Sequence, residues 1–207
     1  MKNTLKIICA ALCLLTVFSL CACSQQNYTV QEAKEKYQNG DYAAALKMFT
    51  ALAENDGEAA CYAGCMYFAG EGTGVDKEKA KEYFELSAEA ENLNGIYNLG
   101  VYYEDAQDYK TAIEYYQKGA YRGDGNSINA LGTFYEKGLG VATDYAHAAE
   151  YYKVGAAKGN VMSMMHLAEF YEKGIGVEKD INLAKDYYKM AADAGNRDAA
   201  KKLEELA

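Results

Sequence analysis

The sequence predicts an all-α fold, an α-solenoid of about five helix-turn-helix repeats with a C-terminal capping helix. The 207 residues include no proline and 19 glycines, a composition that favours uninterrupted helices joined by glycine turns. Half of the residues are apolar and 25% are charged, which is typical of a chain that buries a core rather than of a disordered one. The third observation is a pattern that recurs five times at a spacing of 32–36 residues.

The N-terminus has the pattern of an export signal. Lys2 and Lys6 precede an apolar run over residues 7–18. This run is shorter than the roughly 20 residues that a transmembrane helix needs, but it has the length of the apolar part of a secretory signal. We therefore expect the chain to be exported.

The apolar run ends in Leu20-Cys21-Ala22-Cys23, which resembles the lipobox of bacterial lipoproteins. By that resemblance residues 1–22 are a lipoprotein signal peptide, Cys23 carries the lipid and residues 23–28 are a short tether. A simple signal peptide cut at the same place, with Cys23 left as a thiol, is the alternative. The resemblance implies a bacterial cell envelope location. Because Ser24 is not the aspartate that retains many lipoproteins, this is the outer membrane in a Gram-negative host and otherwise the cell membrane.

The net charge disfavours a nucleic-acid partner. The formal charge is −9, and removal of the signal segment with its two lysines and no acid makes it −11. A protein that follows phosphates along a nucleic acid needs the opposite sign.

Five aspartates mark the recurring pattern, and their separations are 35, 32, 36 and 36 residues. Each is followed by alanine after four residues, by an aromatic residue after eight and by alanine again after twelve. Steps of four residues are close to one helical turn, so these positions share one helix face. The markers are Asp41, Asp76, Asp108, Asp144 and Asp180, and the aromatic residues are Phe49, Phe84, Tyr116, Tyr152 and Tyr188.

The pattern predicts two antiparallel helices in each repeat, which we call the first and the second helix. In the fourth repeat we expect a first helix over about 127–137 and a second helix over about 145–157. Gly138 fits the left-handed residue that ends a helix. Asp144 stands where an N-cap accepts hydrogen bonds from the free amides of the second helix. Paired tyrosines such as Tyr151 and Tyr152 are expected to direct one ring to the first helix and the other to the next repeat.

These residues resemble the Sel-one-like repeat family, a subfamily of tetratricopeptide-type α-solenoids. The match is clearest at Leu131-Gly132, Tyr135, Gly138, Gly140-Val141, Asp144, Ala148, Tyr151-Tyr152, Ala156 and Gly159. The resemblance covers residues 29–207 and implies a right-handed superhelix with a concave face that binds proteins or peptides.

Two repeats depart from the family pattern. The third has residues 104–107 in place of a Gly-x-Gly-Val loop and is four residues shorter, which gives it tetratricopeptide spacing. The first, around Asp41, also resembles a tetratricopeptide repeat. At the C-terminus, Ala200, Leu203 and Leu206 recur at helical spacing and predict a capping helix.

No motif in the sequence predicts catalysis, a metal or a cofactor. The Gly-x-Gly loops follow helices and lack the lysine and hydroxyl residue of a phosphate-binding loop. His147 with Glu150, and His166 with Glu169, form two His-x-x-Glu pairs, but a metal centre needs more ligands than these. We therefore expect a non-enzymatic protein without a cofactor.

Cys61 and Cys65 are the remaining candidates for chemistry. They stand four residues apart on one face of a first helix and could form a soft-metal contact or a redox pair. The interpretation that we favour is two small apolar residues on a packed face. Some Sel-one-like proteins have a disulfide in each repeat and are assigned β-lactam hydrolysis. Here no second helix contains a cysteine, which counts against both features.

The tetratricopeptide register, transferred by resemblance, predicts a concave groove that binds a protein or peptide. Its mixed amide, aromatic and acidic lining favours a polar peptide. The predicted lining is Asn94, Tyr97, Val101, Asn126, Asn129, Thr133, Glu136, Lys137, Met162, Met165 and Glu169.

Three alternatives to this adaptor function stay open. The concave face can be solvated with no fixed partner, because exposed polar residues need no ligand. The chain can be a structural or regulatory spacer at the membrane. By analogy with the cysteine-rich relatives it can also be a hydrolase of β-lactams or cell-wall fragments, a reading that rests on family association alone.

Overall fold

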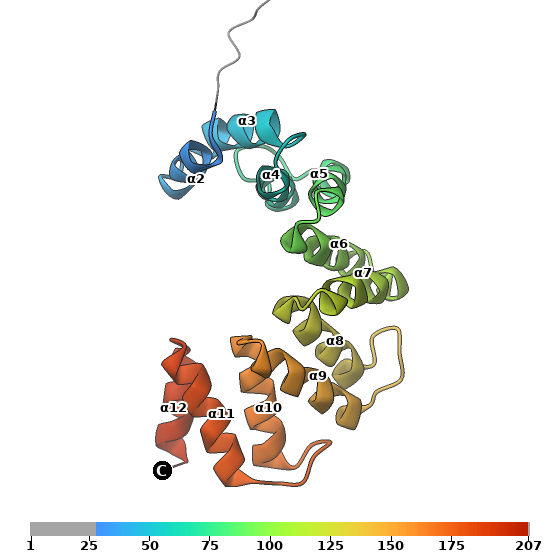
Figure 1. Cartoon of the computed structure of the whole chain (residues 1–207), viewed down its shortest axis with the longest axis vertical. Coiled ribbons are helices and arrows are strands. Elements are labelled where there is room, and N and C mark those ends of the chain that lie inside the picture. The colour runs from blue at the N-terminus through green and yellow to red at the C-terminus, as the bar shows by residue number, and fades with distance from the viewer. Residues whose placement is uncertain (1–27, 207) are drawn as a thin grey trace, which may run out of the picture.

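The computed structural model describes residues 28–206, and every regular element in that part of the chain is a helix (Figure 1). The predicted signal peptide, Cys23 and all of the tether except Tyr28 lie outside the described residues. None of the described helices is long and apolar enough to cross a membrane.

Eleven helices in the described part form five consecutive pairs and a final single helix. The pairs are α2 (Val30–Gln38) with α3 (Tyr42–Leu52), α4 (Gly57–Ala69) with α5 (Lys77–Glu89), α6 (Leu93–Asp105) with α7 (Tyr109–Tyr121), α8 (Gly125–Lys137) with α9 (Tyr145–Ala157), and α10 (Val161–Lys173) with α11 (Ile181–Asp193). Helix α12 (Arg197–Glu205) packs on α11 and caps the array. Each helix packs on the next in sequence, and the array curves into an arc (Figure 1). The predicted solenoid with its cap is confirmed.

All five marker aspartates are N-caps of second helices, as predicted. The Asp144 carboxylate accepts a hydrogen bond of 2.9 Å from the backbone N–H of His147. The first helices from α4 to α12 are capped in the same way by a second set of residues that the sequence pattern did not mark. These caps are Asp56, Asn92, Asp124, Asn160 and Asn196.

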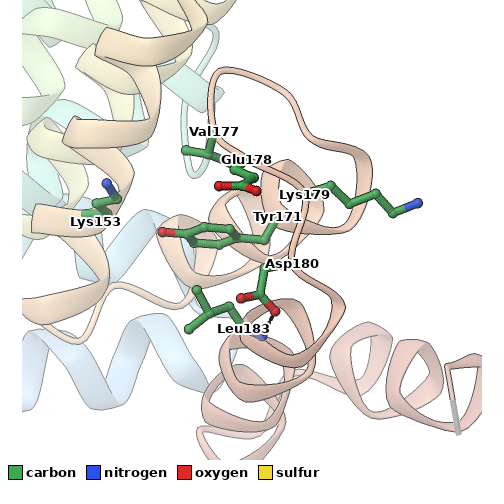
Figure 2. A pocket seen from close by; sticks show the side chains of 7 residues that line it. All are labelled: Lys153, Tyr171, Val177, Glu178, Lys179, Asp180 and Leu183. Atoms are coloured by element: carbon green, nitrogen blue, oxygen red, sulfur yellow. Dashed lines mark hydrogen bonds between the residues drawn. The ribbon is translucent and has the colours of Figure 1, made fainter.

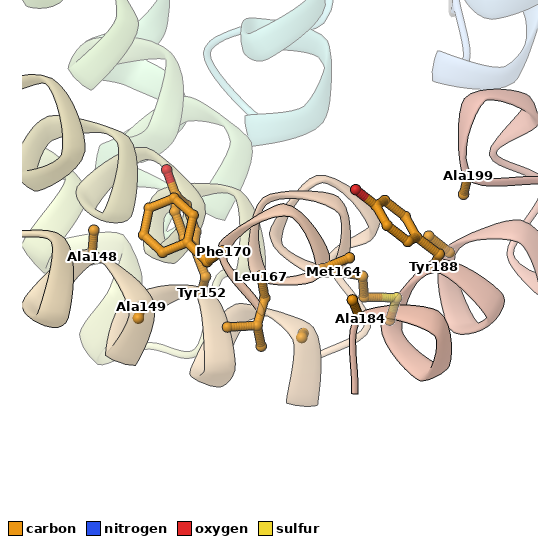
Figure 3. Close-up of a cluster of buried hydrophobic side chains, with 12 residues drawn as sticks. Ala148, Ala149, Tyr152, Met164, Leu167, Phe170, Ala184, Tyr188 and Ala199 are labelled. Carbon is orange, nitrogen blue, oxygen red and sulfur yellow. The ribbon is translucent and has the colours of Figure 1, made fainter. Parts of the chain in front are cut away.

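The core repeats one contact in which an aromatic ring of the second helix lies against a small residue of the first. Tyr152 of α9 is fully buried, and a Cβ placed on Gly132 of α8 would lie 2.5 Å from its ring. On its other side the ring meets Phe170 of the next first helix, α10, with centroids 5.4 Å apart (Figure 3). Tyr116 makes the same edge-to-face contact with Phe134. Each of these rings therefore joins two repeats.

The hydroxyl of this buried tyrosine is held by a glutamate of the first helix in its own repeat. Tyr116 donates to Glu104 at 2.7 Å, and Tyr188 donates to Glu172 at 2.7 Å. Burial, assisted by the hydrogen bond to the carboxylate, raises the pKa of both tyrosines above the usual value. Tyr152 donates to Glu136 of α8 in the same way, and its pKa is raised for the same reasons.

The neighbouring tyrosine of each pair packs inside its own repeat, as expected. Tyr151 stacks on Tyr135 of α8, with ring centroids 5.6 Å apart. The same stack recurs in three other repeats, between Tyr67 and Tyr83, Tyr103 and Tyr115, and Tyr171 and Tyr187.

The Gly-x-Gly loops have a second role that the sequence did not reveal. The first glycine, such as Gly174 with φ 74°, ends the first helix in the left-handed conformation. The second, Gly176, lies so close to the preceding repeat that a Cβ there would be 2.3 Å from the backbone oxygen of Tyr145. The loop is therefore also a contact between repeats, which requires a residue without a side chain.

Removal of an N-cap should weaken the array measurably. Asp144→Ala deletes the acceptor for the first turn of α9, so we expect the free energy of unfolding to fall by about 1 kcal/mol. For a chain of this size that change lowers the Tm by about 2–4 °C, measured by circular dichroism. Asp144→Asn keeps the acceptor and should stay within a few tenths of a kcal/mol of the wild type. Equal losses in both variants would contradict the capping role.

High pH should unfold the protein through its buried tyrosines. Tyr116, Tyr152 and Tyr188 have raised pKa values in the folded state, whereas an unfolded tyrosine ionises near about 10. Their contribution to stability is therefore complete below about pH 10 and is lost as the pH rises further.

We expect a late step in tyrosinate absorbance that coincides with the loss of helical circular dichroism. Tyr152→Phe should reduce this late step, whereas Tyr151→Phe should reduce the earlier absorbance, because Tyr151 is only half-buried. Complete ionisation of all tyrosines with the helical signal intact would show that these hydroxyls are not held as described.

Candidate functional site

The eleven residues predicted to line a groove all lie on the first helices α6, α8 and α10. None of them is fully buried. Helix α4 contacts α6 and α6 contacts α8, so first helices of successive repeats follow one another along one side of the array. We call this side the concave face, and two hollows lie on it.

The N-terminal hollow has a volume of about 370 Å³ and is lined by α2, α4, α6 and α8, all of them first helices. It contains three of the predicted residues, Asn94, Tyr97 and Asn126. Cys61 and Cys65 also occupy concave positions of the transferred register, although packing is the interpretation that the sequence favours for them. Sequence reasoning missed the remaining lining residues because they belong to the irregular first repeat or lie outside that register. The full lining is Tyr37, Glu58, Cys61, Tyr62, Cys65, Met66, Asn94, Tyr97, Asn98 and Asn126.

Hydrogen bonds fix the orientation of one amide in this hollow. The backbone N–H of Ser163 donates to Asn160 Oδ1 at 2.8 Å, so the other end of the Asn160 amide is its NH₂ group. That NH₂ group donates to Asn126 Oδ1 at 2.9 Å. Asn126 therefore turns its own NH₂ group away from this bond, and this group has no hydrogen-bond partner within residues 28–206. The hollow thus offers a donor to an incoming acceptor.

The C-terminal hollow has a volume of about 250 Å³ and lies on α10, α11 and α12. It contains three more predicted residues, Met162, Met165 and Glu169. Met162 is 52% exposed. Charged residues surround the two methionines, and the remaining lining is His166, Glu172, Lys173, Tyr188 and Lys202.

His166 contributes an aromatic wall rather than a charge to this hollow. Its ring stacks on that of Tyr152 with centroids 4.6 Å apart, and its Nδ1 atom lies 3.8 Å from Glu136. Burial lowers the pKa of His166, although the nearby Glu136 and Glu169 oppose the shift. The imidazole is therefore neutral at pH 7, and the positive charge comes from lysines.

The other five predicted residues lie outside both hollows. Three of them are engaged in the packing between helices: Glu136 accepts from the Tyr152 hydroxyl, Thr133 Oγ lies 3.3 Å from the same hydroxyl, and Asn129 accepts from Ser163 Oγ at 3.1 Å. The last two are Val101, which packs against the core, and Lys137, which is exposed. Their role in binding a partner stays a prediction.

The prediction that Cys61 and Cys65 are both packed apolar residues is right for one of them. Cys61 is buried, whereas Cys65 is exposed in the N-terminal hollow, and both are free thiols. The Nδ2 group of Asn98 donates to both sulfur atoms, at 3.3 and 3.4 Å. The prediction is wrong for Cys65 because α4 turns this residue toward the hollow and away from the core.

A larger hollow of about 530 Å³ lies beside the loop between α10 and α11 (Figure 2). Two of its four charged side chains already have local partners. Asp180 caps α11 by accepting from the backbone N–H groups of Asn182 and Leu183, and Lys153 pairs with Glu150 at 2.8 Å. Because none of the eleven predicted residues lines this hollow, we place the candidate site on the concave face.

The two His-x-x-Glu pairs do not form a metal centre in the described part of the chain, where no cluster of three or more potential ligands occurs. His147 instead stacks on Tyr135 with centroids 4.2 Å apart.

Comparison with known proteins identifies the repeat. The Sel1 repeat model matches residues 57–92, 94–124, 126–160 and 161–196, which leaves the first helix pair outside the match. A Sel1 repeat protein from Oxalobacter formigenes is 29% identical with a TM-score of 0.74, over 86% of this chain and 74% of that one. No curated protein matches the chain.

The protective antigen c5321 of uropathogenic Escherichia coli is 32% identical with a TM-score of 0.69, over 83% of this chain. The chain spans only 39% of that antigen's length. The immunity protein PA5088 from Pseudomonas aeruginosa is 21% identical with a TM-score of 0.57, over 81% of this chain and 67% of that one, and shares the fold. The chain therefore belongs to the Sel1 repeat family, whose members are in general adaptors that bind other proteins.

Proposed function

We propose that this protein is an exported, lipid-anchored adaptor that binds a segment of a partner protein along its concave face, without catalysis. The observation that carries the proposal is the pair of hollows lined mainly by first helices, which contain six of the eleven residues predicted for the groove. Stacked repeats present an extended surface, and solenoids use such surfaces for segments of other proteins.

The N-terminal hollow is suited to an extended peptide backbone. The NH₂ group of Asn126 is an unused donor, and Asn94 beside it is exposed. Carbonyl oxygens of an extended segment are the acceptors that such amides bind. The rings of Tyr37, Tyr62 and Tyr97 add apolar area for the side chains between those carbonyls.

The C-terminal hollow is suited to an apolar side chain of the same segment. Met162 and Met165 are flexible and polarisable, so they can adapt to ligands of different shape. Lys173 and Lys202 lie beside Glu169 and Glu172, so the rim carries both signs of charge. This pattern of an apolar centre with a polar rim is that of a protein interface.

The N-terminal pattern supports the location of the adaptor. A lipid on Cys23 places the solenoid at the surface of a membrane in the bacterial cell envelope, which is the outer membrane in a Gram-negative host and otherwise the cell membrane. The short tether from there to α2 keeps the array close to that surface. The acidic charge of the chain then belongs to its solvated surface.

Cross-linking should distinguish the concave face from the rest of the array. We expect a photo-crosslinking amino acid at position 162 to capture a defined partner in the native envelope. The same amino acid at position 190 should not, because Met190 is similarly exposed, at 44%, but lies on the second helix α11.

Substitution within the hollows should then weaken the captured complex. Met162→Ala and Asn94→Ala should each reduce affinity by about tenfold if they are central contacts, whereas Met190→Ala should have no effect. Equal capture from positions 162 and 190, or a complex insensitive to both hollow substitutions, would contradict the proposed groove.

Metabolic labelling tests the anchor. Cells expressing the full chain with a fatty-acid analogue should yield labelled protein that partitions with membranes. Cys23→Ala should lose both properties, while Cys65→Ala, which removes a thiol of the folded body, should keep them. Labelling that survives Cys23→Ala would exclude this cysteine as the lipidation site.

A further inference from the structure

The thiol of Cys65 has surroundings that the adaptor function does not explain. It is exposed on the concave face and lines the N-terminal hollow of about 370 Å³, which is large enough for a small molecule. The neighbouring Cys61 is buried one helical turn earlier on the same face of α4. A small reagent in the hollow therefore reaches Cys65 first.

One amide joins the two sulfur atoms. Asn98 of α6 donates through Nδ2 to Cys61 Sγ at 3.3 Å and to Cys65 Sγ at 3.4 Å. Hydrogen-bond donors favour the thiolate form, which is the nucleophilic form of cysteine. The pKa of Cys65 is lowered by its hydrogen bonds with the Cys61 thiol and the Asn98 amide. The pKa of Cys61 is raised by its hydrogen bond with Cys65 and by burial.

The two cysteines cannot easily form a disulfide with each other. Side chains four residues apart on a helix have Cβ atoms about 5–6 Å apart, but a disulfide needs about 3.5–4.5 Å. Closure would therefore distort α4 near its centre. An adduct on Cys65 would not be released by attack from Cys61.

The charge beside the hollow indicates which reagents fit. The Glu71 carboxylate accepts a hydrogen bond of 2.8 Å from Tyr37, a residue of the lining, and its charge opposes ionisation of Cys65 by raising the pKa of that thiol. That bond, with burial, raises the pKa of Tyr37 to about 12, so the hydroxyl stays protonated. Glu58, the acid that lines the hollow itself, is paired with Lys34. Anionic reagents are therefore disfavoured relative to cationic ones.

We propose that Cys65 is a modification site that forms a mixed disulfide with small disulfides, preferentially cationic ones, held in the N-terminal hollow. The Cys65 proton leaves to water, and the thiolate attacks one sulfur of the reagent. A bond forms between Cys65 Sγ and that sulfur, and the disulfide bond of the reagent breaks. Its electron pair leaves with the other half of the reagent, which is released as a thiol after it takes up a proton. Cys65 is oxidised and half of the reagent is reduced.

The test uses the reduced full chain with cystamine, a cationic disulfide, and with oxidised glutathione, an anionic one. Mass spectrometry of proteolytic peptides assigns the adduct to individual cysteines. We expect Cys65 to react faster than Cys61, and faster with cystamine than with oxidised glutathione by several-fold at low salt. This preference should shrink as salt screens the carboxylate.

Variants separate the proposal from general thiol reactivity. Asn98→Ala should slow the reaction because the thiolate loses a donor, whereas Asn182→Ala, which removes an exposed amide of α11 outside the hollow, should not. Cys65→Ser should abolish the body adduct, and Cys61→Ser should keep it on Cys65. Circular dichroism confirms that each variant is folded. Modification of Cys61 first, a Cys61–Cys65 disulfide as the main product, or a rate that does not exceed that of the denatured chain would overturn the proposal.

Discussion

The array depends on the packing of one ring, the buried aromatic residue eight positions after each marker aspartate. In Tyr152 this ring fills the space left by Gly132, meets Phe170 of the next repeat and directs its hydroxyl to a glutamate of its own repeat. A larger residue than glycine or alanine at position 132 would push the ring out of this space. Because each ring touches two repeats, the stability of one repeat is coupled to that of its neighbour.

The same contact determines which surface remains for function. Second helices direct their alanines and aromatic rings inward, and first helices use their small residues to receive them. The polar edge of each first helix is then left uncovered on the concave face, where α4, α6, α8 and α10 follow one another. Some of this edge is engaged by the array itself, since Glu136 and Asn129 hold neighbouring helices. The partner segment that we propose would therefore meet the hollows, where this engagement is incomplete.

The sequence predicted the fold well because the fold repeats. Every marker aspartate caps a second helix, and the periodic alanines and rings form the core. Residues that act outside the period were harder to predict. Asn98 contacts two sulfur atoms of the preceding repeat, and Gly176 contacts the backbone of Tyr145, although neither contact has a counterpart in a helix considered alone. The register placed the predicted lining on first helices that contribute to the two hollows, but depth and exposure, such as that of Cys65, depend on the relative position of repeats.

Differences between equivalent positions are informative in such an array. Cys61 and Cys65 of α4 correspond to Tyr97 and Val101 of α6, and the other two equivalent pairs are Asn129 with Thr133 and Met165 with Glu169. The core beneath these positions is nearly the same in every repeat. Packing against that core therefore does not explain why the first residue of the pair is a cysteine in one repeat, a tyrosine in the next, and then an asparagine and a methionine. The backbone is thus a uniform support, and chemical differences along the concave face are where specificity for a partner or a reagent can arise.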